Sequence, residues 1–152
     1  MLREDGPVGR AQMLWRKEMQ ATEIEHFYLA YIACLNAQDW SRLADFVEVD
    51  VRHNDRPLGV AGYRVMLQND FANIPDLRYE VELLVVNTNC VGSRLRFDCS
   101  PRGKFLGLPV NGKRVVFSEN VFYELRDDKI ARVWSVIDKA SIEAQLLESR
   151  SQ

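Results

Sequence analysis

VVFSENVFYELRDDKIARVWSVID, residues Val115–Asp138, contains two apolar-rich runs separated by the charged residues 126–129. In the first run the apolar residues on alternate positions are Val115, Phe117, Val121, Tyr123 and Leu125. Strict alternation of this kind predicts a β-strand with one buried face. The charged residues between the two runs predict a tight hairpin that joins two antiparallel strands.

A hairpin with Asp127 and Asp128 in the turn has a definite register. Counting outward predicts the pairs Leu125–Ile130, Val121–Trp134, Glu119–Val136 and Phe117–Asp138. Glu119 interrupts the apolar face of the first strand, and Asp138 then lies diagonally across from it on the same face. Diagonal neighbours in a sheet are about 7–8 Å apart, so the two carboxyls are predicted to line one cavity. A change of register by one residue would turn one strand over and separate them.

The overall composition is that of an ordinary globular protein. The chain has 152 residues, the size of one domain, of which 47% are hydrophobic and 28% charged. The net charge is −2, and no basic stripe with interleaved aromatic residues indicates a nucleic-acid partner. No apolar run approaches the roughly 18 residues that a membrane helix needs, so no membrane partner is expected.

Residues 1–20 form an N-terminal extension in this interpretation, and residues 21–148 form a single domain. The extension contains acidic residues and no apolar core, so it does not resemble a secretory signal. The three cysteines are odd in number and show no C-x-x-C spacing, which argues against a disulfide framework or a zinc site. We therefore expect reduced cysteines in a cytoplasmic protein.

Helical periodicity comes first along the chain, and long alternating runs follow. Helices are predicted over 21–36, 39–47, 60–71 and 140–148, and strands over 49–54, 77–85 and 91–99 in addition to the hairpin. Val49, Val51 and His53 are predicted to share one face of the first strand. Residues 101–114 form a loop with an apolar cluster, of the kind that often serves as a lid or a subunit contact. Helices followed by antiparallel strands indicate the α+β class.

Four strings carry a family resemblance: RPLGVAGYR (56–64), IPDLRYEV (74–81), RGKFLGLPVNGKRVVFSE (102–119) and DDKIARVWSVIDKASIEAQL (127–146). Together with the order of elements they resemble the SnoaL-like polyketide cyclases of the nuclear-transport-factor-two-like superfamily. The most specific piece is the loop followed by the W-x-x-x-D ending, Trp134 and Asp138. The resemblance implies a cone, in which a strongly curved antiparallel sheet wraps around three N-terminal helices and encloses a ligand cavity. It also implies a short C-terminal helix, and homodimers or higher homo-oligomers formed on the sheet.

The resemblance further implies a lyase or isomerase that acts without a metal or organic cofactor on a hydrophobic, carbonyl-containing small molecule. Its reaction would be an aldol-type cyclisation or a related isomerisation. A carboxylate in an apolar cavity suits this chemistry, because desolvation raises its pKa and makes it a stronger base. Nearby hydrogen-bond donors would hold the developing oxyanion. Because the superfamily uses one fold for many functions, a non-catalytic small-molecule-binding domain remains the alternative.

Three residues are candidates for catalysis: Asp138, Glu119 and His53. The resemblance matches the strand-end aspartate to Asp138, as base or acid; the alternative is a cap for the helix that follows. Glu119 is either a second cavity acid or half of a buried ion pair with Arg132. His53 is placed near the cavity mouth by the resemblance, and its alternative is a structural histidine.

The candidate substrate-binding residues are Trp134, Tyr123, Phe117, Val121, Tyr28, Tyr63 and Phe105. Among them Tyr123 also has a hydroxyl that could donate to an enolate oxygen. The chain departs from the characterised cyclases in one respect. Those enzymes use a histidine together with the aspartate, and no histidine follows His53 in this sequence. The ligand-binding alternative therefore stays open.

Overall fold

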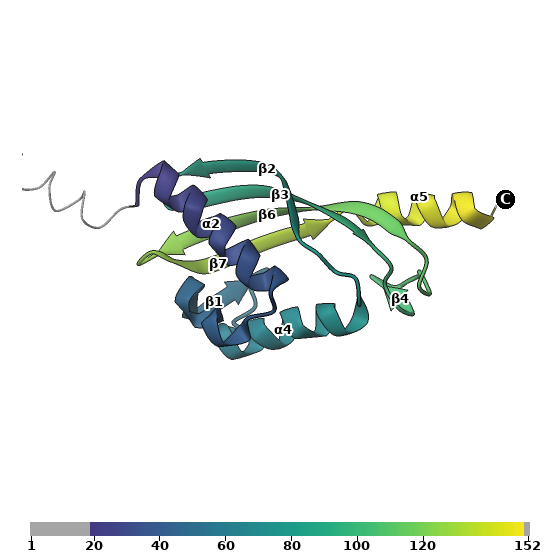
Figure 1. Cartoon of the computed structure of the whole chain (residues 1–152), viewed down its shortest axis with the longest axis horizontal. Helices are drawn as coiled ribbons and strands as arrows, with labels where there is room; N and C mark the ends of the chain where they lie inside the picture. Colours follow the sequence, from purple (N-terminus) through teal and green to yellow (C-terminus); the bar gives the residue numbers. More distant parts are fainter. Residues whose placement is uncertain (1–18, 151–152) are drawn as a thin grey trace, which may run out of the picture.

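The computed structural model describes residues 19–150, so residues 1–18 of the predicted N-terminal extension lie outside the described part (Figure 1). The helices are α2 (Ala21–Asn36), the 3-10 helix η1 (Trp40–Arg42), α3 (Leu43–Phe46), α4 (Gly59–Asn73) and α5 (Lys139–Arg150). The strands are β1 (Val47–His53), β2 (Glu80–Asn87), β3 (Cys90–Cys99), β4 (Lys104–Phe105), β5 (Leu108–Pro109), β6 (Val115–Arg126) and β7 (Lys129–Ile137). The predicted α+β class is confirmed. None of the helices in residues 19–150 has the length and apolar character of a membrane span.

Five strands form one curved sheet in the order β1-β7-β6-β3-β2, and β4 and β5 form a small separate hairpin. The sheet is antiparallel except at its edge, where β1 runs parallel to β7. Figure 1 shows α2 laid across the sheet, α4 along one side, and α5 extending from the end of β7. This arrangement agrees with the expected cone around three N-terminal helices.

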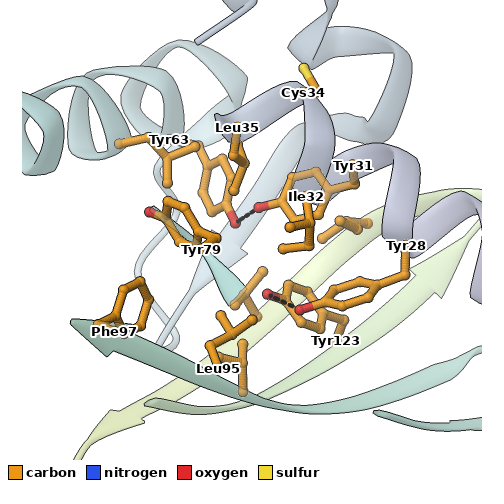
Figure 2. Packing of buried hydrophobic residues seen from close by; sticks show 14 of the residues in the cluster. Tyr28, Tyr31, Ile32, Cys34, Leu35, Tyr63, Tyr79, Leu95, Phe97 and Tyr123 are labelled. Carbon is orange, nitrogen blue, oxygen red and sulfur yellow. Dashed lines mark hydrogen bonds between the residues drawn. The ribbon is translucent and has the colours of Figure 1, made fainter. Parts of the chain in front are cut away.

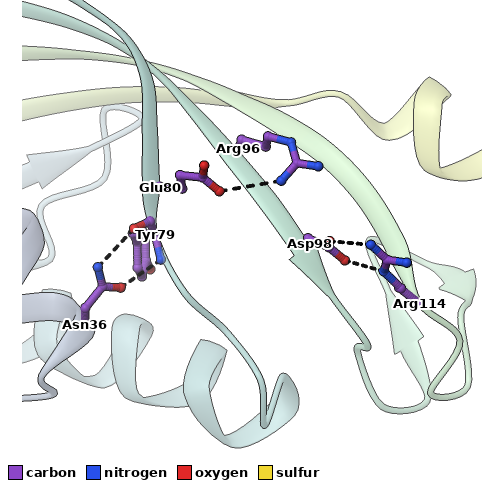
Figure 3. A network of polar contacts seen from close by, with 6 residues as sticks. All are labelled: Asn36, Tyr79, Glu80, Arg96, Asp98 and Arg114. Atoms are coloured by element: carbon purple, nitrogen blue, oxygen red, sulfur yellow. Dashed lines mark hydrogen bonds and ion pairs between the residues drawn. The ribbon is translucent and has the colours of Figure 1, made fainter.

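Helix α2 and strand β6 bury the faces that their periodicities predict. The buried residues of α2 recur at helical spacing and include Ile24, Tyr28, Tyr31 and Leu35. On β6 the five alternating apolar residues from 115 to 125 are all buried. Asn36 joins the end of α2 to the start of β2 through two hydrogen bonds with the backbone of Tyr79, 2.8 and 2.9 Å long (Figure 3). Both apolar packing and hydrogen bonds therefore hold α2 against the inner face of the sheet.

The β6–β7 hairpin contains an irregularity that determines which side chains of β7 face inward. Asp127 and Asp128 form its two-residue turn, with φ of 51° and 62°. Leu125 pairs with Ile130, as predicted. The next residue of β6, Glu124, pairs with Arg132, so Ala131 has no partner and the register shifts by one residue. An extra residue on one strand is a β-bulge.

The bulge changes every later pair of the hairpin. The observed pairs are Glu124–Arg132, Tyr123–Val133, Phe122–Trp134, Val121–Ser135, Asn120–Val136 and Glu119–Ile137. The predicted pairs Val121–Trp134, Glu119–Val136 and Phe117–Asp138 are therefore wrong. Because side chains alternate along a strand, a shift of one residue turns β7 over beyond the bulge.

Trp134 and Asp138 consequently lie away from the positions predicted for them. Trp134 is on the outer face of the sheet, where the Arg132 guanidinium stacks 4.6 Å from its ring centroid. Asp138 is exposed, and its Oδ1 accepts a hydrogen bond of 3.1 Å from the backbone N–H of Ser141 in α5. The prediction that Trp134 and Asp138 line the cavity is wrong, and the alternative interpretation of Asp138 as a helix cap is confirmed.

We expect Asp138→Ala to lower the melting temperature by about 2–4 °C, because it removes the side-chain acceptor at the start of α5. Asp138→Ser, which retains a capping oxygen, should melt close to the wild type. Thermal denaturation followed by circular dichroism measures both. Equal melting temperatures for Asp138→Ala and the wild type would contradict the assigned role.

Candidate functional site

A cavity of about 500 Å³ lies inside the cone. Its walls come from α2, α4, β1, the inner faces of β6 and β7, and the turn between β4 and β5. A smaller side pocket of about 50 Å³ has four residues in common with it: Asp70, Tyr79, Glu119 and Ile137. The two spaces therefore meet at a wall that includes two carboxyl groups.

Most of the sequence-predicted site residues gather around these two spaces. Those that line the main cavity are Glu119, His53, Tyr123, Val121 and Tyr63. Phe117 and Phe105 line the side pocket. Tyr28 stands behind the wall, where its hydroxyl donates a 3.3 Å hydrogen bond to the hydroxyl of Tyr123. Trp134 and Asp138 line neither space.

Glu119 faces the cavity from the inner side of β6. The Ser135 hydroxyl donates a 2.5 Å hydrogen bond to Glu119 Oε2, a contact that exists because the bulge turns Ser135 inward. Arg132 pairs instead with Asp55 at 3.0 Å, so of the two alternatives for Glu119 the buried ion pair with Arg132 is wrong. Burial raises the pKa of Glu119, the hydrogen bond from Ser135 lowers it, and the charge of Asp70 raises it.

Asp70 is a second cavity acid that the sequence interpretation missed. It lies on α4, is half-buried, and burial raises its pKa to about 6. No hydrogen bond from another described residue holds its carboxyl group. A signal was available, because Tyr63, Leu67 and Asp70 are spaced i, i+4 and i+7 and so share one face of the helix. Asp70 is thus an acidic residue at the end of the buried face of α4, and Glu119 is an acidic residue within the buried face of β6.

The five tyrosines of the chain are all buried, and four of them line the cavity: Tyr31, Tyr63, Tyr79 and Tyr123. Two pairs are joined through their hydroxyls, Tyr31 with Tyr63 at 2.6 Å and Tyr28 with Tyr123 at 3.3 Å (Figure 2). Burial raises the pKa of every one of these phenols, so they remain protonated at neutral pH. Each pair uses one hydroxyl proton internally, which leaves the other available to a ligand.

His53 lies at the end of β1 and lines the cavity, half-buried, with its ring 6.2 Å from that of Tyr63. Its Nδ1 is buried and has no hydrogen-bond partner among the described residues. Burial and the nearby Arg56 lower the pKa of His53, which favours the neutral ring at neutral pH. The prediction that Val49 shares its face is wrong, since β1 is irregular after Val47 and Val49 is 75% exposed.

Asn54 fixes the residue that holds Glu119. Its side chain accepts a 2.8 Å hydrogen bond from the backbone N–H of Ser135 and donates one of 3.2 Å to the carbonyl of Ser135. The chain from Asn54 through Ser135 to Glu119 thus positions one carboxylate oxygen in the cavity. Within residues 19–150, no group of three or more His, Cys, Asp or Glu side chains is arranged to hold a metal ion.

Comparison with known proteins confirms the family resemblance. The sequence model of the SnoaL-like polyketide cyclases matches residues 25–146. A solved SnoaL-like polyketide cyclase from Agrobacterium tumefaciens is 52% identical, with a TM-score of 0.81 over 84% of this chain and 99% of its own. No match was found among curated proteins.

Two more distant structures share the fold. TsrD from Streptomyces laurentii is 23% identical, with a TM-score of 0.74 over 85% of this chain and 98% of its own. AclR from Streptomyces galilaeus, a candidate hydroxylase, is 21% identical, with a TM-score of 0.69 over 85% and 98%. The family match covers most of the chain, and it includes α4, β6 and β7, which carry the cavity acids and Ser135. The chain therefore belongs to the SnoaL-like polyketide cyclase family.

Proposed function

We propose that this protein is an acid–base enzyme that removes a proton from the carbon beside a carbonyl group in a small hydrophobic molecule. The resulting enolate would close a ring by aldol addition or return as an isomer. The observation that carries the proposal is a carboxylate, Glu119, buried in a cavity among protonated phenols and held by a single hydroxyl donor. These are the components that enolate chemistry requires.

Glu119 is the proposed base. Its burial raises its pKa and so strengthens it as a proton acceptor, while the hydrogen bond from the Ser135 hydroxyl lowers the pKa and orients the carboxyl group. One carboxylate oxygen is engaged by Ser135, so the other is available to the carbon acid. A base must lie within hydrogen-bond reach of the proton it abstracts, and the fixed position of Glu119 satisfies this need for a ligand in the cavity.

The paired tyrosines are the proposed oxyanion donors. Tyr63 and Tyr31 share one hydrogen bond, and the remaining hydroxyl proton of the pair can bind the enolate oxygen. Tyr123 offers a second donor, because its own hydroxyl accepts from Tyr28. Donors of this kind stabilise the charge that develops in the transition state, and the loss of one typically costs about 10²–10³ in rate.

Asp70 is the proposed proton carrier. Its pKa of about 6 allows it to gain and lose a proton near neutral pH. In a ring closure, the proton taken from carbon by Glu119 is balanced by the proton delivered to the new alkoxide. Two carboxyls in one cavity can perform both transfers, so the proposed reaction needs no cofactor.

Ligand binding without turnover is the second candidate. It is favoured by the absence of histidine from β6 and β7, since His53 on β1 is the only histidine that lines the cavity. The cavity would then recognise a carbonyl compound through the same phenols. Exchange of a substrate proton with solvent distinguishes the two functions.

We also propose that two copies associate through the outer face of the sheet. Leu83 and Val85 of β2, Phe122 of β6 and Val136 of β7 are between 57% and 70% exposed there. The first three border a groove of about 580 Å³. A cluster of exposed large apolar side chains bordered by polar residues is typical of an interaction site.

The charges beside this groove support a second copy as its occupant. Glu82–Arg94 and Glu80–Arg96 are ion pairs on neighbouring strands, and Figure 3 shows the second of them. Both signs are present in one patch, so a two-fold axis can bring an arginine of one copy opposite a glutamate of the other. A patch that is complementary to itself favours an isologous dimer.

A cytoplasmic location is part of the same proposal. Cys34, Cys90 and Cys99 are all free thiols, and two of them are buried. Disulfides are rare and thiols persist in reducing compartments, which supports the cytoplasm.

Glu119→Gln should reduce proton abstraction by at least about 10²-fold, because the amide cannot act as a base. The measurement is incorporation of deuterium from D₂O at the α-carbon of a panel of aryl β-keto esters, followed by NMR. Glu124→Gln, on the outer face of the same strand, is the matched control and should exchange like the wild type. Unchanged exchange in Glu119→Gln contradicts the assignment, and a wild type that binds these esters without exchange identifies the second candidate function.

Asp70→Asn should shift the acidic limb of the kcat/KM profile to lower pH. The base works when it is ionised, so activity rises as pH passes upward through the pKa of Glu119. Asp70 raises that pKa, and its neutral replacement removes the effect. The profile of Asp128→Asn, an exposed turn residue, should coincide with that of the wild type. A limb in Asp70→Asn that stays in place or moves to higher pH would show that the two carboxyls do not interact.

Phe122→Glu should convert the proposed dimer to a monomer, since it places a charge in the apolar outer face. Sedimentation velocity at micromolar concentration measures the association state. Val65→Glu, which changes a similarly exposed residue on α4, should remain a dimer. A monomeric wild type, or a dimeric Phe122→Glu, would overturn the proposed interface.

A further inference from the structure

The site has two chemically different ends. The side pocket is apolar beyond the residues shared with the main cavity, and the residues that make it so are Ile74, Leu77, Phe97, Phe105 and Phe117. Three of its rings pack together, with Phe117 stacked 5.3 Å from Phe97 and tilted at 5.5 Å from Phe105. This end can accept only a compact apolar group.

The opening of the main cavity carries positive charge. Arg56, in the turn after β1, and Lys139, at the start of α5, line the cavity and are exposed, so they lie at its mouth. Neither forms an ion pair with an acidic side chain in residues 19–150. The acids next to them in sequence are engaged elsewhere, Asp55 with Arg132 and Asp138 with the N–H of Ser141. Both cations are thus free to bind an anion that enters the cavity.

Glu119 and Asp70 lie between these two ends. Both line the main cavity and the side pocket, whereas Arg56, Lys139 and His53 line the main cavity alone. A ligand that spans the site therefore has its middle atoms beside the carboxyls. The carboxyl groups of Glu119 and Asp70 would repel a ligand anion placed deep in the cavity. An anionic group that stays at the mouth lies instead beside the positive charges of Arg56 and Lys139.

We propose that the substrate is a keto acid, with a compact apolar group at one end, a carboxylate at the other, and the reacting carbonyl between them. The apolar group enters the phenylalanine-lined pocket, the carbonyl lies beside Glu119 and the tyrosine pair, and the carboxylate binds Arg56 and Lys139. Charge-assisted hydrogen bonds from these cations orient the molecule and exclude the reverse orientation, which would place an anion among phenyl rings. This assignment rests on the proposed function for the role of Glu119, but the binding it describes does not require turnover.

Isothermal titration of the full chain with 4-oxo-4-phenylbutanoate and with its methyl ester tests the assignment. The acid should bind about tenfold more tightly than the ester, and this preference should shrink as salt is added. Arg56→Gln and Lys139→Gln should each weaken binding of the acid by about threefold, a typical effect for an exposed ion pair, and leave the ester unaffected. Arg126→Gln and Lys113→Gln remove the same charge away from the cavity and serve as matched controls.

Equal affinity for the two compounds, equal effects of the mouth and control variants, or no binding of either compound would each overturn the keto-acid assignment. The deuterium-exchange assay separates this outcome from failure of the proposed function. Exchange on neutral keto esters that depends on Glu119 would keep the enzyme while the keto-acid assignment falls. Selective binding of the acid without exchange would keep the ligand class and remove the enzyme.

Discussion

The β-bulge at Ala131 determines the chemistry of the cavity. Before it, Leu125 and Ile130 pair as a simple two-residue hairpin requires. After it, the serine at 135 turns toward Glu119, and the neighbouring tryptophan turns out to the convex surface. One extra residue in a strand thus decides whether β7 presents a hydroxyl donor or an indole ring to the face that carries the buried carboxyl of Glu119.

Burial of two carboxyl groups in one cavity is costly, and the surroundings reduce the cost in different ways. Glu119 receives a hydrogen bond from Ser135, which is itself fixed by Asn54. Asp70 has no such donor, and its pKa rises to about 6, so that it can take up a proton instead of holding a charge. The two acids therefore differ in their environments, and such a difference allows a base and a proton carrier to coexist in one site. The tyrosines add donors without adding charge.

Strand β6 contributes side chains to the cavity on one face of the sheet and to the apolar groove on the other. Its inward residues, Glu119, Val121 and Tyr123, belong to the cavity. Its outward residues, Asn120 and Phe122, border the apolar groove on which we place the second copy. Because the side chains alternate, association on the outer face would stabilise the backbone that positions Glu119 without entering the cavity.

Local patterns in the sequence determined the α+β class, the buried stripe of α2, the inward face of β6 and the position of Glu119 on it. These features depend on periodicities of 3.6 and 2 residues, which can be counted along a single segment. The family resemblance was also evident in the sequence, since short strings carry it. The segment 101–114, predicted as a loop, instead contains the small hairpin of β4 and β5, which puts Phe105 on a strand.

Tertiary structure alone decided which residues meet Glu119. The bulge at Ala131 leaves no mark in the apolar pattern, so counting along the hairpin placed Asp138 in the cavity and Ser135 outside it. The position of Asp70 in the cavity depends on how α4 docks against the sheet, because the sequence of a helix face does not specify which residues of other elements it will contact. The sequence contained both acids of the site, but their pairing depends on contacts between segments far apart in the chain, and no periodicity within one segment encodes such contacts.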